Sequence, residues 1–260
     1  MTAPRISADK IIKTLGIVEP ADIDVEAIGQ FCGATIVYER LTGCEARIVG
    51  NADRAIITVN SEARRGRQRF SAAHELGHWM YDRNRVGFSC ANAIFRSQWG
   101  VVNPEQAANE FAADLLLPET IFHRHSYASP VTFEAVRNLA TKFGTSVAAT
   151  AIRLVQHGSF PAMVVYLMEG SRKWFVAGPD VPKALWPREI PSVNTIAGDL
   201  LRGKSAPLEP QNVQADGWLT HPRSESYELV EDSVRFRDGS ILSLLWWKNE
   251  KQIIDLMESD

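Results

Sequence analysis

The sequence predicts an α+β fold in two structural parts, and three observations lead to this prediction. In the first part, segments with helical apolar spacing alternate with short strands rich in β-branched residues. Beyond a change of composition near residue 158, most of the predicted elements are strands. The 260 residues are enough for one large domain or two small ones. We therefore expect a mixed domain at residues 1–158 and a small, β-rich accessory domain at residues 159–260.

The elements of this fold follow from periodicity and from helix-start and turn residues. The stretch at residues 43–60 has the pattern of a β-hairpin, and its second strand leads into the helix that carries His74. We expect helices at residues 6–15, 24–32, 104–117, 132–143 and 146–156, and strands at 34–39, 54–60, 162–168, 173–178, 226–232 and 241–247.

The composition is that of an ordinary globular protein. Apolar residues make up 45% and charged residues 23%, and a net charge of −3 gives no overall attraction to nucleic acid or anionic membranes. No apolar run approaches the roughly 18 residues that span a bilayer, and the N-terminal segment lacks a signal-peptide core. The cysteines Cys32, Cys44 and Cys90 form no C-x-x-C pair, so we expect free thiols in a reducing cytoplasm.

The helices at 132–143 and 146–156 resemble a helix-turn-helix, with Gly144 in the turn, inside a subregion at residues 126–157. A DNA-reading helix needs side chains that reach base edges. The second helix instead presents small apolar residues, with Arg153 and Gln156 only near its end. We therefore expect a structural role for this pair and no direct DNA binding.

The strongest chemical signal is His74-Glu75-Leu76-Gly77-His78. Residues four apart on a helix share one face, so the imidazoles of His74 and His78 can bind one metal ion. Glu75 is rotated away from this pair and suits a general base acting on water. Gly77 costs about 1 kcal/mol in a helix relative to alanine, which indicates a close approach by another element. An ordinary amphipathic helix would leave the imidazole pair unexplained.

A catalytic zinc usually takes three protein ligands and keeps one position open. The third histidine of an H-E-x-x-H-x-x-G-x-x-H arrangement is missing. Glu105, in the first turn of the next predicted helix, is the preferred third ligand, and Asn109 one turn later can orient His74 by accepting a hydrogen bond. Glu110 and Asp114, on another face of that helix, remain alternatives, as does a remote histidine.

The groups that would contact a substrate stay open at this stage. Tyr81 is expected to pack, whereas His123 and His125, on a turn after Pro118, are either oxyanion donors or surface residues. The hairpin strand ahead of the metal helix either aligns an extended peptide at its edge or is covered.

Three stretches together resemble the ImmA/IrrE family of zinc metallopeptidases, over about residues 34–156. They are RQRFSAAHELGH, EQAANEFAADLLLP and NLATKFGTSVAATAIRL. The resemblance implies a zincin-like fold, zinc bound by His74, His78 and Glu105, and a catalytic Glu75. It also implies a cytoplasmic protease that cleaves helix-turn-helix repressors of stress-response or mobile-element genes. Residues 160–260 lie outside the resemblance.

The predicted function is therefore a zinc-dependent endopeptidase that cleaves a specific intracellular protein, and the resemblance implies that this protein is a helix-turn-helix transcriptional repressor. Manganese or iron can also occupy a site of two histidines and one glutamate. The alternative is a non-proteolytic zinc-binding regulator or an antitoxin-like module that binds a partner. The intact Glu75 argues against this alternative, because a purely structural metal site does not need a base.

Overall fold

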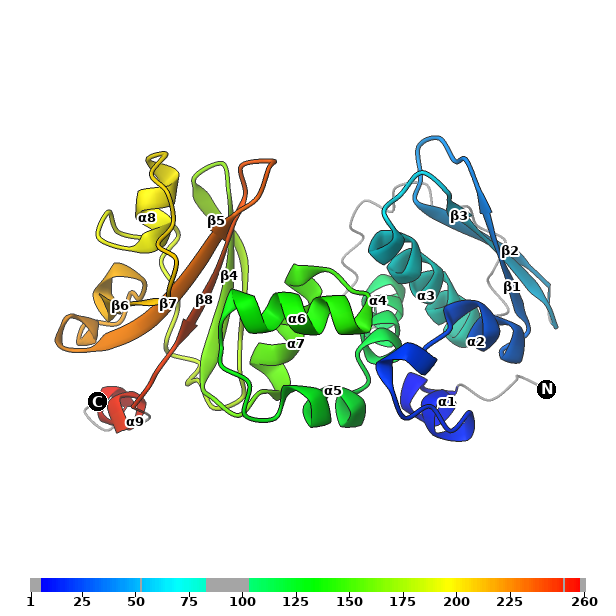
Figure 1. Ribbon diagram of the computed structural model, residues 1–260, viewed down its shortest axis with the longest axis horizontal. Coiled ribbons are helices and arrows are strands. Elements are labelled where there is room, and N and C mark those ends of the chain that lie inside the picture. The colour runs from blue at the N-terminus through cyan, green and yellow to red at the C-terminus, as the bar shows by residue number, and fades with distance from the viewer. Residues whose placement is uncertain (1–5, 52, 83–102, 250, 258–260) are drawn as a thin grey trace. The chain divides into compact units, whose positions relative to one another are not determined.

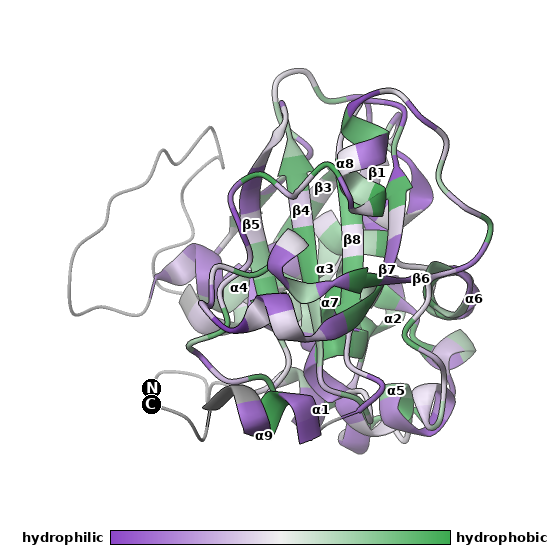
Figure 2. Cartoon of the chain, turned by 90° about the vertical axis from the view of Figure 1, so that its left-hand side faces the viewer, coloured by the Kyte–Doolittle hydropathy of each residue, from purple (hydrophilic) through white to green (hydrophobic). Residues whose placement is uncertain are grey.

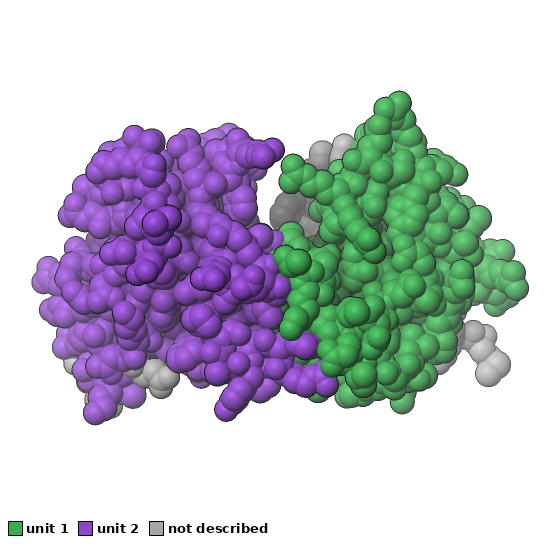
Figure 3. Space-filling model, viewed as in Figure 1, with its two compact units in different colours: residues 1–122, 140–146 green, residues 123–139, 147–260 purple. Residues whose placement is uncertain are grey.

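The computed structural model describes residues 6–51, 53–82, 103–249 and 251–257 (Figure 1). Helices and two β-sheets make up these residues, which confirms the predicted α+β class. The chain divides into two compact units, drawn in different colours in Figure 3. Unit 1 contains residues 1–122 and 140–146, and unit 2 contains residues 123–139 and 147–260. The expected domain boundary near residue 158 stays a prediction.

Unit 1 contains the helix with the predicted metal-binding motif. The described helices and strands are α1 (Ala8–Thr14), α2 (Val25–Phe31), β1 (Ala34–Glu39), β2 (Ala46–Gly50), β3 (Ala55–Asn60), α3 (Arg65–Asp82) and α4 (Pro104–Leu116), with a short 3-10 helix at Pro20–Asp22. The helices begin where the sequence supplies capping side chains. Ser7 accepts a hydrogen bond from the Lys10 amide, and Asp24 accepts one from the Ala27 amide.

A three-stranded sheet in the order β1-β3-β2 packs on α3. Strand β1 runs parallel to β3, and β2 runs antiparallel to it, as expected for the predicted hairpin. Ile57 of the central strand pairs with Ile36 and Ile48, and both Ile48 and Ile57 are buried. On the helix side, Trp79 is fully buried and its indole nitrogen donates to the carbonyl of Cys32 over 2.8 Å. The sheet therefore fixes the rotation of α3 about its own axis.

Unit 2 is built on a second sheet. Its elements are α5 (Glu119–Ser126) and α6 (Phe133–Phe143), each with residues in both units, followed by α7 (Val147–His157), β4 (Ala162–Met168), β5 (Ser171–Ala177), α8 (Ile196–Leu201), β6 (Gln211–Gln214), β7 (Glu228–Arg235), β8 (Ile241–Trp246) and α9 (Lys251–Met257), with 3-10 turns at Ala215–Gly217 and Ser224–Ser226. Gly144, at φ +64°, lies in the turn between α6 and α7. Arg153 of α7 is buried, with 7% of its surface exposed.

The sheet of unit 2 has five antiparallel strands in the order β5-β4-β8-β7-β6. Its strands β4 and β8 are hydrophobic, whereas the edge strand β5 contains both hydrophilic and hydrophobic residues (Figure 2). One face packs into an apolar cluster that contains Met163, Leu245 and the two buried indoles of Trp218 and Trp247. Continuous apolar runs such as residues 162–168 are typical of strands that are covered on both faces.

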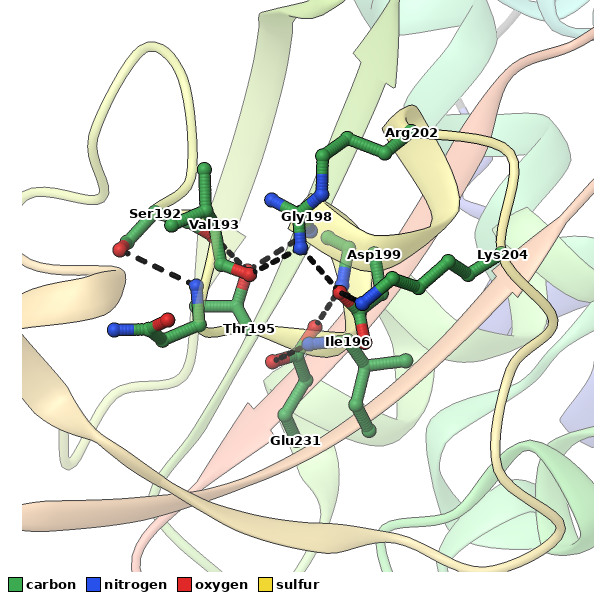
Figure 4. Close-up of polar contacts among 11 residues, drawn as sticks. Ser192, Val193, Thr195, Ile196, Gly198, Asp199, Arg202, Lys204 and Glu231 are labelled. Carbon is green, nitrogen blue, oxygen red and sulfur yellow. Dashed lines mark hydrogen bonds and ion pairs between the residues drawn. The ribbon is translucent and has the colours of Figure 1, made fainter.

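One buried carboxylate, that of Glu231, lies on this apolar face. Glu231 of β7 is fully buried and accepts hydrogen bonds from the amides of Ile196 and Ala197, at 2.9 and 2.7 Å, at the start of α8 (Figure 4). The hydroxyl of Ser233 donates to the same carboxylate. Burial raises the pKa of Glu231, while these hydrogen bonds oppose the rise. Glu231 therefore connects a six-residue helix to a strand that is distant in sequence.

Several details differ from the sequence-based expectation. His123 and His125 lie on helix α5 rather than on a turn, and α8 and β6 lie between residues 178 and 226, where the sequence analysis expected no element. Cys32 and Cys44 are free thiols, as predicted, whereas Cys90 lies outside the described residues. Within the described ranges, no helix has the length and apolar content needed to cross a bilayer.

Candidate metal centre

Helix α3 places His74 and His78 side by side, as the four-residue spacing predicts. Their Nε2 atoms lie 3.1 Å apart, and the rings meet edge to face with centroids separated by 4.7 Å. The side chains are mostly enclosed, with 16% and 12% of their surfaces exposed. Two imidazole nitrogens at this separation face a common point, which is the arrangement that a shared metal ion requires.

Helix α4 brings the carboxylate of Glu105 to the same point. Asn103 caps this helix by accepting a hydrogen bond from the Glu105 amide, and Pro104 occupies the first helical position. These two residues fix Glu105 in the first turn. Its carboxylate oxygens lie 3.3 Å from His74 Nε2 and 3.4 Å from His78 Nε2. The preferred third residue of the sequence analysis is thus the one that the structure brings to the histidines.

Asn109 lies one helical turn after Glu105 and contacts the far side of the His74 ring. Its Oδ1 is 2.9 Å from His74 Nδ1. Because an amide oxygen only accepts, Nδ1 carries the proton, and the lone pair of Nε2 points toward Glu105 and His78. Burial lowers the pKa of His74, and the neighbouring His78 lowers it further. A neutral imidazole with a free Nε2 is the form that binds metal.

Gly77 explains how α3 and α4 approach so closely. A methyl group at this position would lie 3.0 Å from Ala108 Cα, 3.1 Å from Ala108 O and 3.2 Å from Phe111 Cβ. Ala108 itself is fully buried. The close approach that the glycine indicated in the sequence is therefore the contact with α4, which carries Glu105 and Asn109.

The donor set fits a divalent metal ion. In the part of the chain that the structure describes, one group of potential metal ligands gathers, namely His74, His78 and Glu105, with ligand atoms within 4.8 Å of one another. Two ligand atoms bound to a tetrahedral zinc at its usual bond lengths lie about 3.3 Å apart. The three separations of 3.1, 3.3 and 3.4 Å match this value. Two nitrogens and one carboxylate also form a common ligand set of catalytic zinc.

The remaining candidates occupy other places. Glu75, next to His74, is 98% enclosed, with a relative exposure of 2%. Tyr81 packs edge-on against Phe111 of α4, as expected. Glu110 is exposed and accepts a hydrogen bond from Gln106. Asp114 is exposed on α4 and is not among the three converging ligands. His123 and His125 lie in unit 2.

The sequence analysis missed two residues on the metal-bearing face of α3. The Phe70 ring lies 6.1 Å from the His74 ring, and the Arg67 guanidinium lies 5.8 Å from the centre of the Phe70 ring. The signal was available, because a spacing of seven residues returns a helix to almost the same face. Arg67 and Phe70 therefore extend the face that carries His74.

Comparison with known proteins agrees with this geometry. Residues 32–155 match the peptidase family M78, described as an IrrE N-terminal-like domain. The chain is 26% identical over 190 residues to the radiation response metalloprotease IrrE of Deinococcus radiodurans, a match that covers 71% of this chain. It spans only 56% of that relative's length.

A solved structure with a similar fold is a Mycobacterium tuberculosis transcriptional regulator. The TM-score is 0.55 at 14% identity, covering 92% of this chain and 74% of that one. This likeness shows a shared fold and nothing about activity. The evidence for the family comes from the matched segment, which contains α3, α4 and the three converging side chains. The match of residues 32–155 to the IrrE N-terminal-like domain and the similarity to IrrE together support the ImmA/IrrE family for this segment of the chain.

Proposed function

We propose that this chain is a zinc-dependent endopeptidase whose metal is bound by His74, His78 and Glu105. The observation that carries the proposal is the convergence of these three side chains from two helices, within 3.1–3.4 Å of one another. The family of residues 32–155 supports a peptidase rather than a structural metal site. Manganese or iron would suit the same donor set.

The residues of the site have separate roles in this reaction. When bound, zinc supplies a Lewis acid that polarises the scissile carbonyl and makes water more acidic. Asn109 holds His74 in the tautomer that exposes Nε2, and Glu105 contributes the negative charge of the ligand set. Glu75 takes the proton from the attacking water at its carboxylate and later delivers it to the leaving amine.

An edge strand supports an extended peptide as the substrate. β2 is the outer strand of the sheet, and the pairing of residue 45 with Asn60 leaves the backbone groups of Ala46 and Ile48 on the free side. Across the described residues, neither of these two backbones has a further hydrogen-bond partner. Exposed backbone groups of this kind align a peptide by β-sheet augmentation.

The proposed substrate is a helix-turn-helix transcriptional repressor in the cytoplasm, which is what the family resemblance implies. The test incubates the purified, zinc-loaded chain with the repressor encoded beside its gene. We expect the wild type to cleave it and Glu75→Ala to cleave it about 10²–10⁴-fold more slowly, because the general base is lost. Mass spectrometry of the products gives the cleavage site, and zinc content shows that the variant still binds metal.

The other outcomes contradict the proposal. Equal cleavage by the wild type and Glu75→Ala would reveal a contaminating protease. Full zinc occupancy without cleavage of the repressor, or of an unfolded protein, would favour a non-proteolytic regulator that binds a partner.

Asn109→Ala tests the orienting role of the amide. We expect the zinc affinity to fall by about 10–100-fold, because the His74 ring loses the hydrogen bond that fixes its tautomer. Competition with a fluorescent chelator measures the affinity. Asn109→Asp keeps an acceptor oxygen and should retain most of it. Equal losses in both variants would show that the contact does not orient His74.

A further inference from the structure

A positively charged side chain lies beside the metal centre and has no part in the proposed chemistry. Arg67 precedes His74 by seven residues on α3, which corresponds to almost the same face two turns earlier. Phe70 lies between the two, with its ring 6.1 Å from His74 and 5.8 Å from the Arg67 guanidinium. The three side chains form a continuous row along the face that carries the metal ligands.

The described contacts of Arg67 hold it only loosely. Its Nε lies 3.8 Å from a carboxylate oxygen of Glu45, which is beyond the range of a hydrogen bond. The Arg67 side chain is 55% exposed and that of Glu45 is 47% exposed. Ion pairs of this kind in solvent contribute little to stability. A substrate carboxylate that forms two charge-assisted hydrogen bonds with the guanidinium can therefore displace Glu45.

The position of Glu45 shows that Arg67 lies near the start of the edge strand β2. Glu45 directly precedes the edge strand β2, and its carbonyl accepts the hydrogen bond from Asn60 that opens the β2–β3 pairing. The other end of β2 lies near Trp79, because a methyl group on Gly50 would be 3.0 Å from that indole. Strand β2 therefore runs along α3 from the Arg67 end toward its C-terminal half, past the level of His74.

We propose that Arg67, backed by the Phe70 ring, is a specificity residue that binds an acidic side chain of the peptide substrate. This inference rests on the proposed peptidase function and names a substrate feature for that same site. Phe70 gives the guanidinium an apolar and π-electron surface on one side and leaves its donor edge free. The bidentate geometry favours a carboxylate over an amide of the same shape.

The helix geometry gives the distance of this acidic residue from the scissile bond. Seven helical residues rise about 10.5 Å between Arg67 and His74. An extended peptide advances about 3.3 Å per residue. An aspartate or glutamate bound by Arg67 therefore lies about three residues from the bond that is cleaved at the metal.

The test uses the full chain loaded with zinc and a peptide library prepared from a digested proteome. Cleavage sites are read by mass spectrometry, and only those lost in Glu75→Ala are counted. We expect aspartate and glutamate to be enriched at one fixed position about three residues from the cleaved bond. In Arg67→Glu the same position should instead favour lysine and arginine.

Matched peptides make the test quantitative. Three peptides that carry Glu, Gln or Lys at the enriched position are compared by kcat/KM. For the wild type, the Glu peptide should exceed the Gln peptide by about tenfold, and Arg67→Glu should reverse the order between Glu and Lys. A purely structural role for Arg67 would lower all three values together and could not produce this reversal.

Arg65→Glu is the matched control. It makes the same charge change on the same helix, two residues earlier and about 200° around the axis. We expect the wild-type order of peptides and full zinc content. Glu75-dependent cleavage with an unchanged preference in Arg67→Glu would overturn the role of Arg67 and leave the peptidase intact. Absence of any Glu75-dependent cleavage would overturn both.

Discussion

Replacing Glu105 with alanine is expected to lower the zinc affinity by more than about 100-fold, a larger loss than removal of a supporting hydrogen bond causes. The substitution removes the only negative charge among the three converging side chains and leaves two imidazoles. The structure gives this residue both partners, because its oxygens lie 3.3 and 3.4 Å from the histidine nitrogens. Zinc stoichiometry and competition with a chelator measure the effect.

Glu110→Ala is the control for this experiment. Glu110 lies on the same helix about 140° away from Glu105, is exposed, and contacts Gln106 rather than a histidine. The zinc affinity of this variant should equal that of the wild type. Unchanged affinity in Glu105→Ala would instead move the ligand role to Asp114 or another residue, and circular dichroism would show whether both variants remain folded.

Gly77→Ala is expected to destabilise the protein and to weaken zinc binding at the same time. Alanine gains about 1 kcal/mol of helix propensity over glycine. The added methyl group would lie 3.0 Å from the Ala108 backbone, and overpacking of this kind costs about 1–3 kcal/mol. The cost exceeds the gain, because a helix backbone cannot move away locally. Displacement of α4 would carry Glu105 with it.

Gly66→Ala, near the start of the same helix, separates propensity from packing. A methyl group there would have its nearest neighbour, Gly144 O, at 3.7 Å, which is an ordinary contact. This variant should be as stable as the wild type or up to about 1 kcal/mol more stable. Urea unfolding with and without zinc measures both variants. Equal stability and equal zinc affinity in both would show that α4 is not held by the contact at Gly77.

Much of the site could be predicted because local rules determine it. The spacing of His74 and His78, the start of a helix at Pro104 and the four-residue step from Glu105 to Asn109 are short-range properties of helices. The glycine at position 77 indicated the contact with a second helix. The choice of Glu105 over Glu110 followed from which face of one helix each residue occupies.

The elements that the sequence analysis missed depend on contacts between distant residues. Helix α8 has six residues, too few to be stable alone, and two of its first amides bind the carboxylate of Glu231 from β7. Strand β6 is short, and its residues are mostly exposed, so it lacks an apolar pattern. Periodicity carries no information about such partners. Arg67 and Phe70 lie inside the stretch RQRFSAAHELGH, but the sequence analysis gave them no role because it considered only the metal-binding residues of that stretch.

The contact between Gly77 and Ala108 ties the ligand geometry to the packing of the two helices. The relative position of α3 and α4 is set where the backbone of Gly77 meets the backbone of Ala108. We therefore expect evolution to keep a small residue at both positions wherever the chelating geometry is kept.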